Sequence, residues 1–125
     1  YSKHVLSVGA GKVIFSEGDG AKEMFIIIDG SVEISKRTSM DSSKTLIVLK
    51  QGDIFGEMAI IEQKPRSATA IARQPSVVII LTKKGFDILT VDYPSVGVTL
   101  LKTIMRMLSL NMRLTTSKLV DTLPE

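Results

Sequence analysis

Residues 24–35 read Met-Phe-Ile-Ile-Ile-Asp-Gly-Ser-Val-Glu-Ile-Ser and carry the clearest fold signal in the chain. A short apolar run, Met24 to Ile28, ends at Asp29-Gly30, and the residues from Ser31 to Ser35 then alternate polar and apolar. Strict alternation is typical of a strand with one buried face. Because Asp-Gly between two such runs is a strong hairpin signal, we expect these two strands to pair with each other.

Similar short runs lie on both sides of this segment. They predict further strands at residues 5–8, 13–15, 45–49, 67–72 and 77–81. Short strands at intervals of about 8–12 residues are typical of a sandwich or a small barrel. The polar stretch from Arg37 to Lys44 is expected to form an exposed loop between two of them.

The hydrophobic period changes after residue 81. A first helix is predicted from Lys83 to Val91, and Pro94 suits the first turn of a second helix. Apolar residues then recur at steps of three and four, which predicts an amphipathic helix of about 20 residues. We therefore expect residues 1–125 to form one mainly β domain, with a jelly-roll β-barrel over about 5–81 and two C-terminal α-helices over about 83–118.

Composition excludes several classes of site. The 125 residues carry a formal net charge of +3 and include no cysteine and one histidine, His4. Disulfides, thiolate metal sites and multi-histidine metal sites are therefore excluded. We expect no metal, no cofactor and no enzyme activity. Because no apolar run approaches the roughly 18 residues of a membrane span and no signal peptide is recognisable, we expect no membrane partner and a cytoplasmic location.

Residues 52–69 interrupt the strand pattern and read Gly-Asp-Ile-Phe-Gly-Glu-Met-Ala-Ile-Ile-Glu-Gln-Lys-Pro-Arg-Ser-Ala-Thr. A short helix is expected from Glu57 to Ile61, and a glycine before it leaves backbone N–H groups that favour an anion. Arg66 adds a planar fork suited to two phosphate oxygens. An ionised glutamate only accepts hydrogen bonds, so Glu57 suits a sugar hydroxyl. Together these residues predict a sugar-phosphate ligand.

The same segment resembles the phosphate-binding cassette of the cyclic nucleotide-binding domain family. Phe55-Gly-Glu-Met-Ala59 and, after a short turn, Pro65-Arg-Ser-Ala-Thr69 carry the resemblance. It extends over about residues 5–118 and includes Glu17-Gly-Asp19 and the Asp29-Gly30 turn. The family includes catabolite activator-type regulators, regulatory subunits of cyclic nucleotide-dependent kinases and cyclic nucleotide-gated channels. The resemblance implies a sensor domain that binds a cyclic nucleotide and signals through its C-terminal helices.

Individual roles follow from this resemblance position by position. It assigns Arg66 to the exocyclic phosphate oxygens, Glu57 to the ribose 2′-hydroxyl, and Gly56 to close approach of the backbone to the sugar. The positions of Met58 and Ala59 match backbone amides that face the ligand. The remaining positions implied to bind ligand are Phe55, Ser67 and Ala68, together with Thr115 and Thr116, which match a hydroxyl pair that reaches the purine. That pair favours cyclic AMP over cyclic GMP.

Several alternatives stay open at this point. Arg66 and Glu57 could pair with each other at the surface, and the domain could have lost its ligand and act as an interaction module. The predicted long helix carries an apolar stripe, which either packs onto the barrel of its own chain or pairs with a second copy in a homodimer. The stripe consists of Leu101, Ile104, Met105, Leu108 and Met112. Because about ten residues follow Thr115, too few for a helix-turn-helix module, we expect no nucleic-acid binding by this chain alone.

Overall fold

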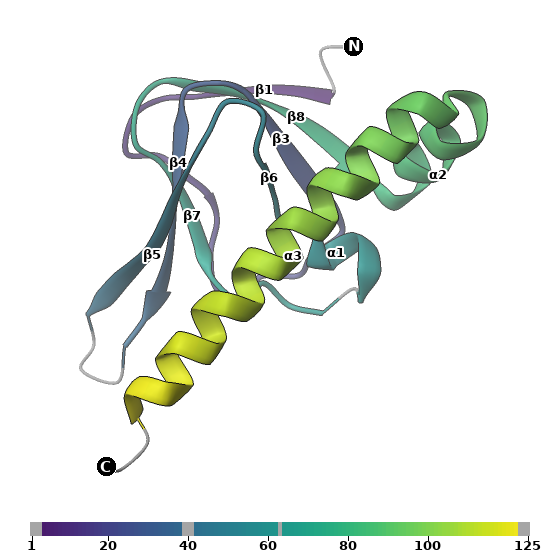
Figure 1. Cartoon of the computed structure of the whole chain (residues 1–125). Helices are drawn as coiled ribbons and strands as arrows, with labels where there is room; N and C mark the ends of the chain where they lie inside the picture. The colour runs from purple at the N-terminus through teal and green to yellow at the C-terminus, as the bar shows by residue number, and fades with distance from the viewer. Residues whose placement is uncertain (1–3, 39–41, 63, 123–125) are drawn as a thin grey trace.

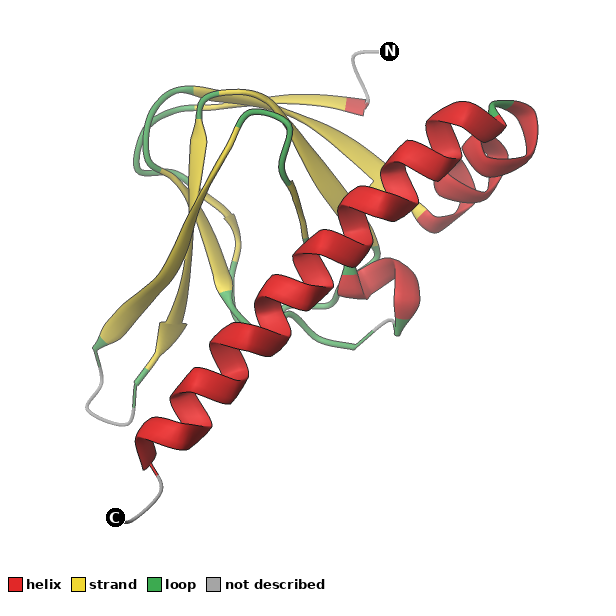
Figure 2. Ribbon diagram, viewed as in Figure 1, coloured by secondary structure: helices red, strands yellow, loops and turns green. Residues whose placement is uncertain are grey.

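The computed structural model describes residues 4–38, 42–62 and 64–122, with the backbone alone described at 111 and from 114 onward. Its strands form two four-stranded antiparallel sheets around a shared core, and the long helix α3 (Pro94–Thr122) runs diagonally across them (Figure 1). Figure 2 shows the strands gathered on one side of the molecule and the helices on the other. The mainly β prediction is confirmed.

The first sheet has the order β1-β8-β3-β6, and the second has the order β2-β7-β4-β5. The strands of the first are β1 (Val5–Val8), β8 (Ser76–Thr82), β3 (Glu23–Asp29) and β6 (Ile54–Phe55). Those of the second are β2 (Val13–Phe15), β7 (Thr69–Ala72), β4 (Ser31–Arg37) and β5 (Ser43–Lys50). No ladder joins the two sheets among the described residues, so closure into a barrel is not confirmed.

The hairpin predicted at Asp29-Gly30 is wrong. Strand β3 pairs with β6 and β8, whereas β4 pairs with β5 and β7 in the other sheet. The Asp-Gly turn therefore carries the chain from the centre of one sheet to the centre of the other. A turn signal marks a change of direction, and it does not specify which strand becomes the neighbour.

The chain passes from one sheet to the other a second time, between β7 and β8, and hydrogen bonds join this second crossing to the one at Gly30. The N–H group of Arg73 donates to the Ser31 carbonyl at 3.0 Å, and the Ser31 N–H donates to Ser76 Oγ at 3.1 Å. Gly30 has a φ of +99°, and a Cβ built on it would lie 2.7 Å from Ser76 Cα. Only glycine allows both this conformation and this close approach.

The observed hairpin is formed by β4 and β5. Strand β4 continues to Arg37 and β5 begins at Ser43, so only the two ends of the stretch expected to be a loop, Arg37 and Ser43–Lys44, belong to the ladder. The register shifts between Ile34 and Ser35, which leaves Leu46 without an opposite residue. The two-residue strand β6 was not predicted, because two residues are too few to show a period.

The three helices follow from local signals. Helix α1 (Met58–Ile61) is the short helix expected in the cassette, and α2 (Lys83–Asp92) begins where Thr82 Oγ1 accepts a hydrogen bond from the Gly85 N–H. Helix α3 has 29 residues, longer than the periodicity predicted. None of the described helices has the length and apolarity needed to cross a bilayer.

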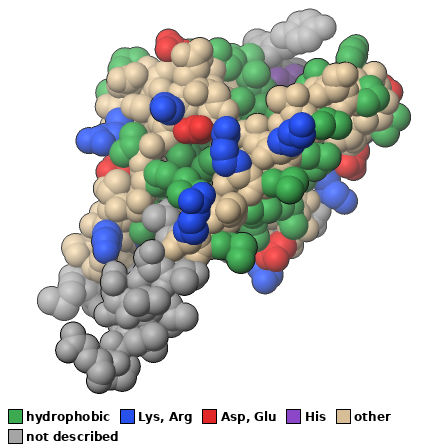
Figure 3. Space-filling view, in the orientation of Figure 1, with side chains coloured by type: hydrophobic (Ala, Val, Ile, Leu, Met, Phe, Trp, Pro, Cys, Tyr) green, Lys and Arg blue, Asp and Glu red, His purple; other side chains and the backbone are tan. Residues whose placement is uncertain are grey.

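The apolar stripe of α3 is divided between the core and the surface. Ile104 is buried and Leu108 packs against the core, and Met107, which the predicted stripe does not include, is buried as well. Leu101, Met105 and Met112 are exposed. Figure 3 shows Lys and Arg side chains along α3, with hydrophobic side chains beside them. Packing onto the sheets of the same chain therefore accounts for part of the stripe only.

The crossing generates a stability prediction. Gly30→Ala should lower the free energy of unfolding by about 2–4 kcal/mol, because it adds backbone strain to a clash with the Ser76 backbone. Gly18→Ala is the matched control, since Gly18 has a φ of +90° and open space around it, and should cost about 1 kcal/mol. Urea unfolding measures both, and equal losses would contradict the role of the crossing.

Candidate functional site

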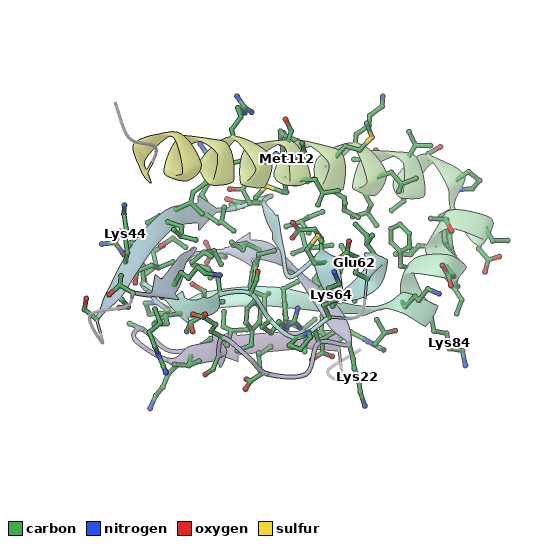
Figure 4. All side chains as sticks on the ribbon, turned by 90° about the horizontal axis from the view of Figure 1, so that it is seen from below. Lys22, Lys44, Glu62, Lys64, Lys84 and Met112 are labelled. Carbon is green, nitrogen blue, oxygen red and sulfur yellow. The ribbon has the colours of Figure 1, made fainter. Side chains whose placement is uncertain are left out.

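A cavity of about 900 Å³ lies between α3, the strands β4 and β5, and the segment that contains α1. This volume lies within the range of about 300–1,000 Å³ that is typical of small-molecule sites. Its walls are mainly apolar, with Ile34 and Ile47 from the sheet and Met107, Leu108 and Met112 from α3. Figure 4 shows Met112 on the helix, with Glu62 and Lys64 side by side below it. The described residues contain no cluster of His, Asp or Glu suited to a metal ion.

The predicted site residues of the cassette meet at this cavity. Its lining includes Phe55, Gly56, Glu57, Met58, Ala59, Arg66, Ser67 and Ala68. Thr115 and Thr116 belong to α3, but their side chains lie outside the described part of the structure. The cassette residues therefore lie together on one wall of the cavity, whereas their contacts with a ligand, and the purine contact of the two threonines, stay predictions.

Gly56 turns the chain from β6 into α1. Its φ is +74°, and a Cβ at this position would lie 2.8 Å from Arg66 Nη1 and 3.4 Å from the ring of Phe25. Strand β6 fixes the start of the turn, because Phe55 pairs with Phe25 and Ile54 with Ile26. The glycine therefore lets the backbone pass directly beside the Arg66 guanidinium.

Two backbone amide groups at the start of α1 form hydrogen bonds within its first turn. The Ala59 N–H donates to the Gly56 carbonyl at 3.2 Å, so it takes part in the turn itself. The Ile60 N–H likewise donates to the Glu57 carbonyl at 3.1 Å. The first turn of the short helix therefore uses the Ala59 amide in this structure, and its contact with a ligand stays a prediction.

The backbone of Arg66 is held by the turn that follows β2. The Arg66 N–H donates to the Asp19 carbonyl at 2.8 Å, and the Gly18 N–H donates to the Arg66 carbonyl at 2.8 Å. Asp19 also accepts from the Ser16 N–H through Oδ2, which stabilises the turn. The Glu17-Gly-Asp19 stretch thus positions an arginine that lies far from it in the sequence.

The side chain of Arg66 lies against the rings of Phe15 and Phe25, which we call its aromatic seat. Its Nη2 donates to the Glu23 carbonyl at 2.7 Å and its Nη1 to the Gly56 carbonyl at 3.1 Å. The guanidinium carbon lies 4.1 Å from the ring centroid of Phe15 and 5.6 Å from that of Phe25. Both distances lie within the range of cation–π attraction. Two hydrogen bonds and two rings therefore fix the orientation of the guanidinium.

The charge of Arg66 is only partly compensated by the protein. The residue is 7% exposed, and Nε is the one buried side-chain polar atom among the described residues that has no hydrogen-bond partner. Burial lowers the pKa of Arg66 from its usual value, whereas the charges of Glu23, Asp19 and Glu57 oppose this shift. A buried cation with an unused donor at a cavity wall favours an anionic ligand.

Glu57 lies at the same cavity, between Gly56 and α1. The residue is 3% exposed and Arg66 is buried as well, so the two do not form the surface ion pair considered from the sequence. The negative charge of Glu57 favours the charged form of Arg66. A buried carboxylate close to a buried cation suits a ligand that carries both a phosphate and a hydroxyl donor.

Sequence reasoning missed Phe15 and Lys36, which also line the cavity. The sequence predicts Phe15 only as a strand residue, because its contact with Arg66 depends on the tertiary structure. Lys36 does leave a signal in the sequence. The polar–apolar alternation of residues 31–35, continued by one residue, places Lys36 at an apolar position.

Known proteins share both the sequence pattern and the fold. Residues 5–93 match the sequence model of the family described as "Cyclic nucleotide-binding domain". A cAMP-dependent protein kinase regulatory subunit of Yarrowia lipolytica is 34% identical over 80 residues, which cover 64% of this chain and 20% of the relative. The cyclic AMP receptor protein of Thermus thermophilus is 29% identical over 76 residues, which cover 61% of this chain and 35% of the relative.

A solved structure gives the same result for the fold. The crystal structure of a cyclic nucleotide-binding domain from Methylobacillus flagellatus aligns with a TM-score of 0.80 and 25% identity, over 97% of this chain and 68% of that structure. The match therefore includes both sheets and the helices that follow them. The chain spans only a fifth to about a third of the length of the two curated relatives.

The aromatic seat generates a prediction on coupling. Phe15→Leu and Arg66→Met should each destabilise the fold, and their combination should cost about 1 kcal/mol less than the sum, because the cation–π contact is lost only once. Phe86→Leu on α2 is the control partner for Arg66→Met. Equal coupling energies for the two pairs, measured by urea unfolding, would show that Phe15 does not interact specifically with the guanidinium.

Proposed function

The chain belongs to the cyclic nucleotide-binding domain family, and on that premise we propose that it is a sensor domain whose cavity holds a cyclic purine nucleotide. The observation that carries this proposal is the seat of Arg66. A buried guanidinium with an unpartnered Nε–H lines a cavity of about 900 Å³ beside a buried carboxylate. We propose a binding role rather than a catalytic one, in keeping with relatives named as regulatory proteins.

The phosphate of the ligand would contact Arg66. A cyclic phosphate carries one negative charge, and its oxygens can accept from Nε while the two rings and two carbonyl groups hold the rest of the guanidinium. A charge-assisted hydrogen bond in a partly dry cavity is stronger than a neutral one. The negative charge of the phosphate would also offset the unfavourable burial of the Arg66 cation, because the charged groups of the protein offset it only in part.

The ribose would contact Glu57. The carboxylate accepts hydrogen bonds and cannot donate them when ionised, so it suits the 2′-hydroxyl of a ribose. Gly56 directly precedes Glu57, and the absence of a side chain there lets the backbone that carries Glu57 pass close to the guanidinium. Because Glu57 and Arg66 are both present and both line the cavity, ligand binding is favoured over a domain that has lost its ligand.

The base would lie against the apolar wall formed by β4, β5 and α3. We propose cyclic AMP as the preferred ligand, in line with the printed names of the kinase regulatory subunit and the cyclic AMP receptor protein. The resemblance of Thr115 and Thr116 to a purine-reading hydroxyl pair supports the same choice. Replacement of both threonines by alanine should then reduce the preference.

Signalling would use α3, because the same cavity has the cassette on one wall and Met107, Leu108 and Met112 of α3 on another. A ligand that contacts both walls favours one position of the helix relative to the sheets. The exposed residues Leu101 and Met105 could then meet a second copy of the chain. We propose this homodimer as the partner that responds to the ligand.

The phosphate contact is tested by Arg66→Ala. We expect cyclic nucleotide binding to weaken by about 1.5–3 kcal/mol, the size of a hydrogen bond to a charged group. Arg73→Ala removes an exposed arginine at the end of β7 and serves as the control, with affinity expected to be unchanged. Calorimetry measures affinity, and thermal unfolding shows that the variants are folded. A folded Arg66→Ala variant with the original affinity would contradict the phosphate contact.

The ribose contact is tested by Glu57→Ala with two ligands. Its affinity for cyclic AMP should fall, whereas its affinity for 2′-deoxy cyclic AMP should change much less, because that ligand lacks the hydroxyl. The protein without substitutions provides the reference ratio for the two ligands. If the substitution weakened both ligands by the same factor, Glu57 would support the structure of the cassette rather than contact the sugar.

A further inference from the structure

Lys36 places a second cation on the wall of the cavity. On β4, Val32, Ile34 and Lys36 share one face, because side chains alternate along a strand and the register shift leaves the extra residue on β5. Val32 is fully buried, and both Ile34 and Lys36 line the cavity. Lys36 therefore occupies a position at which the alternation along this strand predicts an apolar side chain.

The ammonium group of Lys36 is held beside the cassette. Its Nζ donates to the carbonyl of Ser67 at 3.0 Å, and Ser67 directly follows Arg66 in the chain. An ammonium group has three N–H donors, and this bond uses one of them. The ion pairs shown among the described residues, Lys64–Glu62 and Arg106–Asp53, do not include Lys36. Its charge is thus available next to the arginine proposed to bind the phosphate.

The opposite strand makes this position unfavourable in the absence of an anion. The register of β4 and β5 places Lys44 directly across from Lys36. Like charges in opposite positions of a ladder destabilise it. Figure 4 shows Lys44 at the end of the sheet that lies under the C-terminal part of α3. An anion bound in the cavity next to Lys36 would offset this repulsion.

We propose that Lys36 is a second phosphate-binding residue, which leaves the Ser67 carbonyl and donates to the nucleotide phosphate when the ligand is bound. This inference rests on the proposed function and extends it from one cation to two. Arg66 is fixed by its rings and carbonyl partners, whereas the four-carbon stem of Lys36 can follow the ligand. The two cations would contact the phosphate from different walls, and Lys36 would link it to β4.

The test compares Lys36→Met with Lys36→Arg and two control variants. Lys36→Met keeps an apolar stem and removes the charge, and it should weaken cyclic AMP and cyclic GMP by the same factor, about tenfold. Lys36→Arg should retain most of the affinity. Lys12→Met, before β2, and Lys84→Met, on α2, replace exposed lysines outside the cavity lining and should each change affinity by less than about twofold.

Calorimetry with both nucleotides, with thermal unfolding as a check on folding, separates the outcomes. Unchanged affinity of Lys36→Met, in a protein that binds cyclic AMP and loses it on Arg66→Ala, would overturn the role of Lys36 and leave the proposed function intact. Different factors for cyclic AMP and cyclic GMP would show that Lys36 reads the base instead, which also overturns the proposal. A failure of the unaltered protein to bind either nucleotide would overturn both.

Discussion

The burial of one guanidinium group, that of Arg66, is the constraint on which the rest of the site depends. A buried cation is unfavourable unless it is paired or hydrogen-bonded. Distant parts of the chain meet this requirement: the turn at 17–19 holds its backbone, β3 and Gly56 supply carbonyl groups, and Phe15 and Phe25 supply ring faces. Nε alone stays without a partner. The cavity wall therefore includes a buried cation with one donor nitrogen that no protein group uses.

The sheet topology makes this convergence possible. Because Gly30 carries the chain from β3 to β4, the strand that contributes the Glu23 carbonyl and the strand that contributes Lys36 belong to different sheets. The cavity lies where α3 covers the space beside β4, β5 and the cassette. A ligand there would contact groups fixed on the sheets and groups on a helix that packs against the core mainly through Ile104 and Met107. Binding and helix position would therefore be coupled.

The sequence predicts local features well and long-range pairing poorly. The alternation at residues 31–35, the short helix at 58–61 and Pro94 at the start of α3 all appear as expected, because each depends on near neighbours. The sequence predicts a hairpin at Asp29-Gly30, because the same turn residues suit a hairpin and a crossing between two sheets. The cassette residues were found from their motif. The sequence does not indicate a role for Phe15, because that role depends on its contact with Arg66. It also gives little reason to single out Lys36, because one polar residue near the end of a strand hardly changes the pattern.

The most direct test of the central claim is to observe the Nε–H group of Arg66 by NMR during a titration with cyclic AMP and, in parallel, with adenosine. If this group is the unused donor that binds the phosphate, its signal should shift and saturate with cyclic AMP and stay in place with adenosine, which lacks the phosphate. Arg66→Lys would assign the signal by its loss. An Nε–H signal that does not respond to saturating cyclic AMP, or that responds equally to both compounds, would contradict the claim.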